Sequence, residues 1–564
     1  MLISFNFCKQ LEMIKKILSF KKTLLILLVG SIGLFAFKTD DRLFEIAKNL
    51  DIFATLYKEL NANYVDEINP TKAMRTGIQA MLKELDPYTV FYPEDEVEDY
   101  FTMNAGSYNG IGASIEYFEG KHIVVMLYEG SPADKAGIKI GDEVNTINGV
   151  DVVSKTDAEF GRLLKGQKGT NVKLQVYRPG TDKKLDFNVG RDVVKTPTVP
   201  HTGMVKGDVG YVQLTEFNAT ASKEIKTAVL DLKDKGMKKL IIDLRGNGGG
   251  LLQMAIEICN FFIPKGQLVV ETKGKVKEGN QKYATMAQPL DTEIPIVVLI
   301  NGRSASASEI VSGTLQDYDR AVLVGSRSFG KGLVQITKPL SFNTSFKVTT
   351  SKYYIPSGRC IQAIDYGNRA ADGTVSKLPD SLRSIFKTKG GRPVLDGAGV
   401  DPDIATNQEL NSEYTKAIIR QKLTFKYANK YYFENVNQKP KENFSLTAQD
   451  MEVFETWLAK QKNTYKTAEQ KHLENLQKAA KESGEISKMK GSIDELAKLA
   501  DAASNQLPRK NREQLRRDLE AEILGRYYYQ KVMKFAALEK DEDIIKAVEV
   551  LNNTAKYNAI LGKK

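Results

Sequence analysis

Apolar and polar positions follow different patterns in successive regions of the chain. In residues 41–100 apolar side chains such as Phe44 and Ala47 recur at helical spacing, which predicts mostly helix. Residues 108–192 change to short runs rich in β-branched residues, separated by glycine turns, and predict a compact module of strands. Between residues 209 and 404 candidate strands and helices alternate, which is typical of an α/β domain. After residue 408 the pattern is helical and rich in charge.

The α/β region contains continuous apolar runs that predict buried strands. Residues 239–244, 294–300 and 321–324 are such runs, and 251–261 and 306–316 predict the intervening helices. A polar stretch near residues 363–390 has little periodicity and is interpreted as a surface insertion. The region is therefore interpreted as an α/β domain with one inserted segment.

The N-terminus has the pattern of a targeting segment. Several lysines precede an apolar run, residues 23–37, which is shorter than the ~20 residues that a membrane span needs. This arrangement fits the basic and apolar regions of an export signal. An uncleaved anchor in the inner membrane remains the alternative, and either Met1 or Met13 is the start. We therefore expect an exported, periplasmic protein.

Composition and charge exclude several classes of protein. The 564 residues include 81 Lys and Arg against 70 Asp and Glu, a net charge of +11, with 42% hydrophobic and 27% charged residues. These values exclude wholesale disorder. The charges of both signs are interleaved, so a solvated surface is favoured over a nucleic-acid interface. The three cysteines and three histidines lie far apart, and neither a disulfide scaffold nor a metal site is expected.

Ser306 is the first candidate for chemistry. It lies at the predicted start of a helix, where unpaired backbone N–H groups and the helix dipole can stabilise an oxyanion. However, Ser306 and Glu309 also have the spacing of a capping box, in which the serine only begins the helix. From this stretch alone, the capping interpretation is favoured.

A serine nucleophile needs a base, and Lys331 is the better candidate than any histidine. It lies between Gly330 and Gly332, with no carboxylate beside it in the sequence. A lysine base must be neutral, so its pKa must fall from ~10.4 to about 7–8, which burial favours. Gln335 is four residues later, and in an extended strand it would share a face with Lys331. The alternative is an ordinary surface lysine.

Two glycine-rich segments could bind an anion. Residues 246–250 could present backbone N–H groups, but they lack the spacing of a phosphate-binding loop. Residues 110–113 precede a predicted edge strand and could hold the carboxylate of a peptide C-terminus. A purely structural turn explains either segment equally simply.

These motifs together resemble the carboxy-terminal processing, or tail-specific, serine proteases. The resemblance covers about residues 44–404 and its motifs follow the order of the family. They are residues 85–88 (LDPY), 108–113 (YNGIGA), 131–133 (SPA), 136–137, 141–142, 243–250 (DLRGNGGG), 304–309 (SASASE), 325–335, 354–359 and 401–403 (DPD).

The resemblance implies a role for each matching residue and reverses the capping interpretation of Ser306. It implies a Ser306 nucleophile, a Lys331 general base and a Gln335 that orients the base. The remaining positions are an oxyanion hole from Ala307 with Gly248 and Gly249, a supporting Asp317, and a PDZ peptide-binding loop of Gly110, Ile111, Gly112 and Ala113.

The implied fold is a multidomain α+β protein with a crotonase/ClpP-like α/β protease core. The implied activity is a serine endopeptidase whose PDZ domain recognises apolar C-terminal tails of exported proteins, without metal, cofactor or nucleic acid. A non-catalytic PDZ scaffold is the alternative, and acyl-CoA chemistry rests on fold analogy alone. An adaptor or self-association through the C-terminal helices is a further expectation. The predicted domains are residues 1–40 (signal or anchor), 41–105 (helical), 106–192 (PDZ), 193–408 (protease core) and 409–564 (helical).

Overall fold

The structure is a computed structural model that divides into two compact units, Met1–Glu84 and Leu85–Lys564. The predicted export segment, residues 1–40, lies outside the described residues. Of the helices within the described ranges, none is both long and apolar enough to cross a bilayer. The described residues are 41–181, 183–370, 373–406, 411–441, 444–532, 538 and 541–563.

In its described part, residues 41–84, the first unit contains the helices α2 (Asp41–Asn63) and α3 (Pro70–Lys83). The Asn69 side chain caps α3 by accepting a hydrogen bond from the Lys72 N–H at 2.9 Å, and Pro70 occupies the first turn. The two helices meet where the Tyr57 hydroxyl donates to the Pro70 carbonyl at 2.7 Å. The predicted helical character of residues 41–85 is therefore confirmed.

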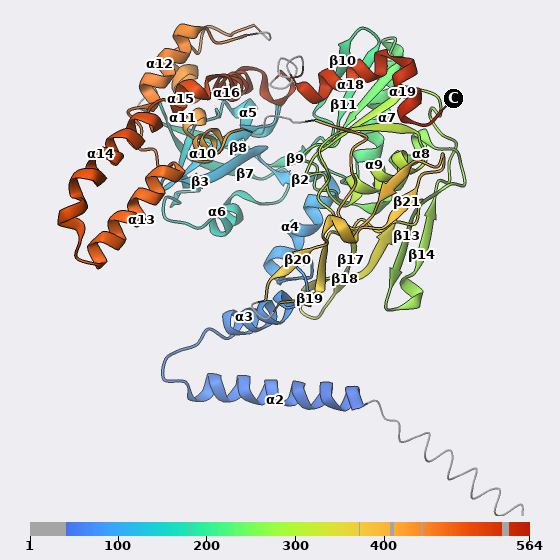
Figure 1. Cartoon of the computed structure of the whole chain (residues 1–564). Coiled ribbons are helices and arrows are strands. Elements are labelled where there is room, and N and C mark those ends of the chain that lie inside the picture. Colours follow the sequence, from blue (N-terminus) through green and yellow to red (C-terminus); the bar gives the residue numbers. More distant parts are fainter. Residues whose placement is uncertain are drawn as a thin grey trace, which may run out of the picture. The chain divides into compact units, whose positions relative to one another are not determined.

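The second unit is built around a six-stranded sheet (Figure 1). All neighbouring strands run parallel except the first pair, which is antiparallel. This sheet confirms the predicted α/β core, since the predicted apolar runs form its central strands. In spatial order the strands are β10 (His201–Lys206), β11 (Val209–Gln213), β12 (Lys239–Asp243), β15 (Ile296–Ile300), β16 (Ala321–Gly325) and β23 (Ile404–Ala405).

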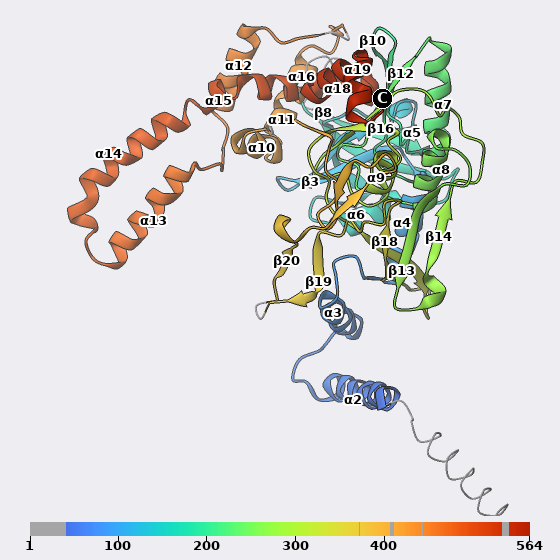
Figure 2. The same ribbon diagram turned by 45° about the vertical axis from the view of Figure 1, so that its right-hand side comes forward.

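Helices cover both faces of this sheet. Leu240 and Ile242 of β12 pack with α7 (Ala221–Asp234), α8 (Leu252–Phe262) and α9 (Ala307–Asp317). Ile241 points the other way and packs with the C-terminal helices α18 (Glu542–Asn552) and α19 (Thr554–Ile560), drawn in red beside the core (Figures 1 and 2). Strands buried on both faces are apolar at successive positions, as the sequence shows. The predicted helical region 409–564 is thus shared between two cores.

A second sheet, in which all neighbouring strands are antiparallel, stands beside this core. Residues 41–100 were expected to be largely helical, but β1 is a strand in this sheet. One of its long strands, β18 (Ser345–Tyr354), escaped prediction because the polar run of residues 349–352 interrupts its apolar pattern. Its members are β1 (Val90–Tyr92), β18 (Ser345–Tyr354), β13 (Leu268–Gly274) and β14 (Gln281–Ala284), with β17 (Leu333–Pro339) also paired to β18.

The strand-rich module forms a separate sheet with its own apolar core. Its helices are α5 (Pro132–Ala136) and α6 (Asp157–Leu164), and α4 (Glu94–Ala105) leads into it. The entry strand β2 (Ser107–Gly110) pairs with the exit strand β9 (Asp192–Lys195), which closes the module. In spatial order the sheet has β3 (Ala113–Phe118), β4 (Lys121–Leu127), β5 (Glu143–Ile147), β7 (Asn171–Arg178) and β8 (Lys183–Gly190), with β6 (Val150–Asp151) paired to β5.

The predicted insertion near residues 363–390 forms small two-stranded sheets. β19 (Ile364–Arg369) pairs with β20 (Val375–Lys377), and β21 (Ile385–Lys387) pairs with β22 (Pro393–Leu395). These strands are short and mostly exposed, which explains their weak sequence signal.

Most of the remaining C-terminal helices, but not α13 and α14, contribute to a further apolar core that includes Phe454 and Leu519. Helices α13 and α14 form a hairpin at one end (Figure 2). The helices are α10 (Glu413–Arg420), α11 (Leu423–Glu434), α12 (Ala448–Leu458), α13 (Ala468–Glu482), α14 (Ile486–Ser504), α15 (Leu507–Lys510) and α16 (Arg512–Val532).

Burial of α18 against the core sheet predicts a large effect of truncating Leu551, which is 2% exposed. Leu551→Ala should lower the free energy of unfolding by roughly 2–5 kcal/mol, because it leaves a cavity between α18 and the sheet. Ile545→Ala, on the same helix but 53% exposed, is the matched control and should change it by less than about 0.5 kcal/mol. Calorimetric melting of both variants measures the difference, and equal destabilisation would contradict the docking of α18.

Candidate active site

Ser306 lies on a tight turn between β15 and α9. Its φ of 55° and ψ of −113° fall in a region that L-residues rarely adopt, so its surroundings must hold it there. The Ala305 N–H donates to the Asn247 carbonyl at 3.0 Å, and the buried Ser304 hydroxyl donates to the Leu244 carbonyl at 2.8 Å. The glycine-rich loop after β12 therefore supports the turn that presents Ser306.

The predicted capping box is present at the start of α9, with Ser306 as the N-cap and Glu309 as the third helical residue. The Glu309 carboxylate accepts the Ser306 N–H at 2.8 Å, and the Glu309 N–H donates to the Ser306 carbonyl at 2.8 Å. Ser306 therefore begins the helix, as the capping interpretation predicted, and also lies where a nucleophile could act.

The glycine loop approaches Ser306 more closely than a side chain would permit. Gly249 has a φ of 101°, and a Cβ added there would lie 2.8 Å from the Ser306 Cβ and 2.7 Å from the Ala305 carbonyl oxygen. Its N–H donates to the Asn247 side-chain oxygen at 2.9 Å and is already used. Within the described residues, the N–H groups of Gly248 and Ala307 have no acceptor. Of the three predicted oxyanion-hole positions, these two keep free donors.

Lys331 lies in the loop before β17 and faces an aromatic ring. Its Nζ is 4.3 Å from the centre of the Tyr88 ring, and its side chain is largely buried. Burial, helped by the positive charge of Lys347, lowers the pKa of Lys331 to about 8, although Glu309 and Asp86 act in the opposite direction. A substantial neutral fraction at physiological pH is what a lysine base requires.

The buried carboxylate of Glu309 joins the Ser306 turn to the Lys331 loop. One oxygen accepts the backbone N–H groups of Ser306, at 2.8 Å, and Lys331, at 2.9 Å. The other accepts the Gly330 N–H at 2.7 Å and the Ser328 hydroxyl at 2.5 Å. Burial raises the pKa of Glu309, while its four hydrogen bonds oppose that shift. From the sequence, Glu309 was interpreted only as part of a helix cap and not as a link between these two segments.

Tyr353 makes a second connection between the same two segments. Its buried hydroxyl lies 2.6 Å from the Lys331 carbonyl and 3.2 Å from the Ser306 carbonyl. The backbones of the two predicted dyad residues are therefore held together from two sides. In the part of the chain that the structure describes, however, no hydrogen bond joins the Lys331 amine to the Ser306 hydroxyl.

Gln335 does not contact Lys331 in the way the sequence suggested. Its amide donates to the Thr349 hydroxyl of β18 at 3.1 Å. Lys331 precedes β17, and a register shift between Val334 and Gln335 interrupts the pairing with β18. The expected sharing of a strand face assumed that the strand includes Lys331, but β17 begins only at Leu333, so Lys331 lies in the preceding loop.

Asp317 supports a neighbouring turn rather than the predicted dyad. Its carboxylate accepts from the Arg359 guanidinium and from the Ser357 N–H, both at 2.9 Å. Both members of the ion pair are 1% exposed at the side chain. Burial raises the pKa of Asp317, with Arg359 opposing the shift.

A network at the start of the glycine loop was not detected in the sequence. Arg245 is the residue before Gly246, and its guanidinium pairs with Asp243 at 2.7 Å, Asp541 at 2.9 Å and Asp543 at 2.8 Å. The last two carboxylates stand at the beginning of α18, 296 and 298 residues away. The C-terminal segment thus holds the loop that approaches Ser306. Nothing in the local pattern of either segment signals this contact.

The predicted peptide-binding loop lies at the edge of the module sheet. Gly112 has a φ of 79°, and a Cβ there would lie 2.2 Å from the Ser131 Cβ, so the turn requires glycine. The carbonyls of Ile111 and Gly112 accept N–H groups of Ala133, at 2.8 Å, and Tyr128, at 3.0 Å. β3, which begins at Ala113, pairs only with β4, so its outer edge is unpaired among the described strands. Such an edge can accept a peptide strand.

Comparison with known proteins identifies the domains. Residues 208–367 match peptidase family S41, residues 123–178 match the PDZ domain, and residues 414–551 match the C-terminal helical domain described for PDZ-proteases. The carboxy-terminal-processing protease of Bartonella bacilliformis is 36% identical over 321 residues, which are 56% of this chain and 73% of that protein. The chain belongs to the carboxy-terminal processing proteases.

Other relatives of this protease carry similar names. The carboxy-terminal processing protease CtpA of Bacillus subtilis is 33% identical over 54% of this chain and 65% of its own. Among solved structures, the photosystem II D1 C-terminal processing protease matches 65% of this chain and 90% of its own, with 25% identity and a TM-score of 0.35. This protein is therefore a carboxy-terminal processing serine protease with a PDZ domain, and its substrates are polypeptides.

The network around Arg245 predicts that the C-terminal segment affects catalysis. Asp543→Asn should lower kcat roughly tenfold with a smaller change in KM, because the glycine loop loses one of its anchors. Glu542→Gln removes a charge from the exposed neighbouring position and is the control. Steady-state cleavage of a tailed reporter by both variants measures the effect. Normal kcat in Asp543→Asn would show that the loop does not depend on α18.

Proposed function

We propose that the protein is an endopeptidase in which Ser306 is the nucleophile and Lys331 the general base. The observation that carries this proposal is the shared Glu309 carboxylate, which binds both backbone segments. The lowered pKa of Lys331, to about 8, supplies the neutral amine that the mechanism needs.

The first step forms the acyl-enzyme. The neutral Lys331 amine takes the proton of the Ser306 hydroxyl as the Ser306 oxygen attacks the carbonyl carbon of the substrate. The negative charge that develops on the carbonyl oxygen faces the N–H groups of Gly248 and Ala307. When the C–N bond breaks, Lys331 returns its proton to the leaving amine.

The second step releases the product. Lys331, neutral again, takes a proton from a water molecule that attacks the acyl carbon, and then returns a proton to the Ser306 oxygen as the ester breaks. Both steps need the amine to turn from the Tyr88 ring toward the Ser306 hydroxyl. In this proposal the lysine side chain rotates while Glu309 and Tyr353 hold the two backbones.

The PDZ domain supplies recognition in this proposal. Its loop of residues 110–113 would bind the terminal carboxylate of an apolar tail, and the free edge of β3 would pair with the peptide. The substrates would be exported proteins, since the lysines and the apolar run at the N-terminus are those of an export signal or an inner-membrane anchor. Cell fractionation tests this location, and recovery of the full-length chain in the cytosol alone would refute it.

The pKa of Lys331, about 8, predicts the pH dependence of cleavage. Below this pKa the amine is protonated and cannot act as a base, so kcat/KM should rise about tenfold per pH unit and level off above pH ~8. A pH profile measured on a tailed reporter gives the apparent pKa. A flat profile between pH 6 and 8 would contradict a lysine base.

Removal of either side chain of the proposed dyad should abolish cleavage but leave tail binding intact. Ser306→Ala and Lys331→Ala should each reduce kcat by at least about a thousandfold. Lys338→Ala removes an exposed lysine from β17 and serves as the control. Mass spectrometry of the reporter fragments and fluorescence anisotropy of the bound tail measure the two properties separately. Tail binding without cleavage by the unaltered protein would instead support the scaffold function.

A further inference from the structure

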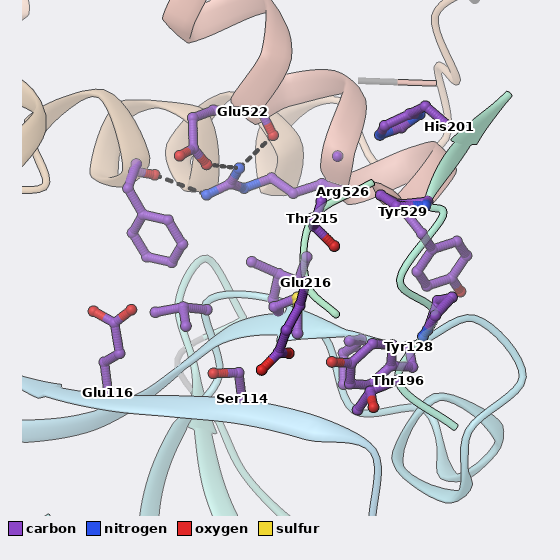
Figure 3. Close-up of a pocket in the computed structure, with 18 of the residues that line it drawn as sticks. Ser114, Glu116, Tyr128, Thr196, His201, Thr215, Glu216, Glu522, Arg526 and Tyr529 are labelled. Carbon is purple, nitrogen blue, oxygen red and sulfur yellow. Dashed lines mark hydrogen bonds and ion pairs between the residues drawn. The ribbon is translucent and has the colours of Figure 1, made fainter. Parts of the chain in front are cut away.

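A cavity of about 570 Å³ lies between the PDZ sheet, the segments that enter the protease core, and the C-terminal helices (Figure 3). β3 and β4 of the PDZ domain form one wall, and α11 and α16 form another. Residues 196–198, 200–201 and 215–216 also line it. Its volume is within the range of ligand pockets in proteins.

The cavity borders the two places that a substrate must reach in the proposed function. On the PDZ side, Ser114 of the lining directly follows Ala113 of the peptide-binding loop. On the core side, Glu216 directly precedes Phe217. The Phe217 N–H donates to the Gly249 carbonyl at 3.0 Å, and its carbonyl accepts the Leu251 N–H at 2.7 Å. Phe217, the residue after Glu216 of the lining, is thus hydrogen-bonded to the glycine loop beside Ser306.

The charges around the cavity leave one carboxylate unpaired. Glu116 is paired with Lys422 at 2.7 Å, and Glu522 is paired with Arg526 at 2.9 Å. Arg526 also donates to the side-chain oxygen of Asn429 at 2.7 Å, so its guanidinium group already has hydrogen-bond partners. Glu216, in contrast, has no hydrogen-bond or ion-pair partner among the described residues. The cavity therefore carries one spare negative charge.

The surroundings of Glu216 suit a long cationic side chain. In Figure 3 the carboxylate extends toward Ser114 and Tyr128. Glu216 is exposed by its accessible surface, and partial desolvation at the cavity raises the pKa of its carboxyl group, as burial raises that of Tyr128, so a nearby cation would stabilise the charged carboxylate. Val125, Leu127 and the other apolar residues of the lining could contact the hydrocarbon part of a lysine or arginine.

We propose that this cavity is a substrate subsite that takes a basic side chain, with Glu216 as its counter-ion. The subsite would lie between the tail held by the PDZ domain and the bond at Ser306. It deepens the proposed endopeptidase function and rests on it. The protease would then select chains that carry lysine or arginine between the apolar tail and the cleaved bond.

The test uses the full-length protein and reporter peptides that end in the same apolar tail. A single lysine is moved along the stretch between the tail and the cleaved bond, and each peptide is compared with its N-acetyl-lysine counterpart, which keeps the stem and loses the charge. At one position the lysine peptide should have a kcat/KM about five- to tenfold higher. In Glu216→Gln this ratio should fall to about one.

Two further variants make the result specific. Asp234→Asn removes an exposed charge from α7, away from the cavity lining, and should keep the ratio of the unaltered protein. Glu216→Lys should reverse the preference toward peptides with glutamate at the same position. A ratio of one at every position in the unaltered protein, or an unchanged ratio in Glu216→Gln, would overturn the subsite.

Failure of the endopeptidase function can be distinguished from failure of the subsite. Fluorescence anisotropy with Ser306→Ala protein measures binding of the same peptides without cleavage. If no peptide is cleaved by the unaltered protein, the binding ratio between lysine and acetyl-lysine peptides still decides the role of Glu216. A binding preference that Glu216→Gln abolishes supports the subsite, and equal binding of both peptides refutes it.

Discussion

The buried carboxylate of Glu309 is the interaction on which the candidate site depends. Its two oxygens accept four hydrogen bonds, which come from the Ser306 turn and from the loop of residues 328–331. A buried carboxylate is costly unless such donors surround it, so the two segments and the carboxylate stabilise one another. The same contacts hold Ser306 in its unusual backbone conformation, which exposes the hydroxyl at the start of α9. One residue therefore joins the segments that carry the proposed nucleophile and the proposed base.

The candidate site also depends on the C-terminal segment, at the far end of the chain. α18 covers one face of the central sheet and brings Asp541 and Asp543 to Arg245, at the start of the glycine loop. If α18 were only a surface appendage, its deletion would leave the parallel sheet covered. Because α18 covers one face of the sheet, its removal would expose Ile241 and its neighbours to solvent. The loop that faces Ser306 is consequently supported by a helix that carries no chemical motif. The burial of the core sheet and the position of the glycine loop therefore both depend on α18.

The sequence predicted the elements with strong local patterns and missed those without them. Residues 239–244 and 294–300 were apolar runs and proved to be β12 and β15, because strands covered on both faces need apolar side chains throughout. β18 was missed because the polar run of residues 349–352 interrupts its apolar pattern. Gln335 was placed beside Lys331 on the assumption that one strand contains both residues, but β17 begins at Leu333 and Lys331 lies in the loop before it. Glu309 was recognised only as a cap, since its bonds to residues 328–331 cross between separate segments.

By itself, the sequence determined which side chains were available: a serine at a helix start, a lysine between glycines, and a glycine loop after a buried strand. These are properties of neighbouring residues, so short motifs record them. Only the tertiary structure decided that Glu309 joins the serine and the lysine, that Tyr88 lies over the amine, and that Asp543 reaches Arg245. It also left Glu216 unpaired beside a cavity. Such contacts join residues that are remote in the chain, and burial, which lowers the pKa of Lys331, exists only when the whole core is assembled.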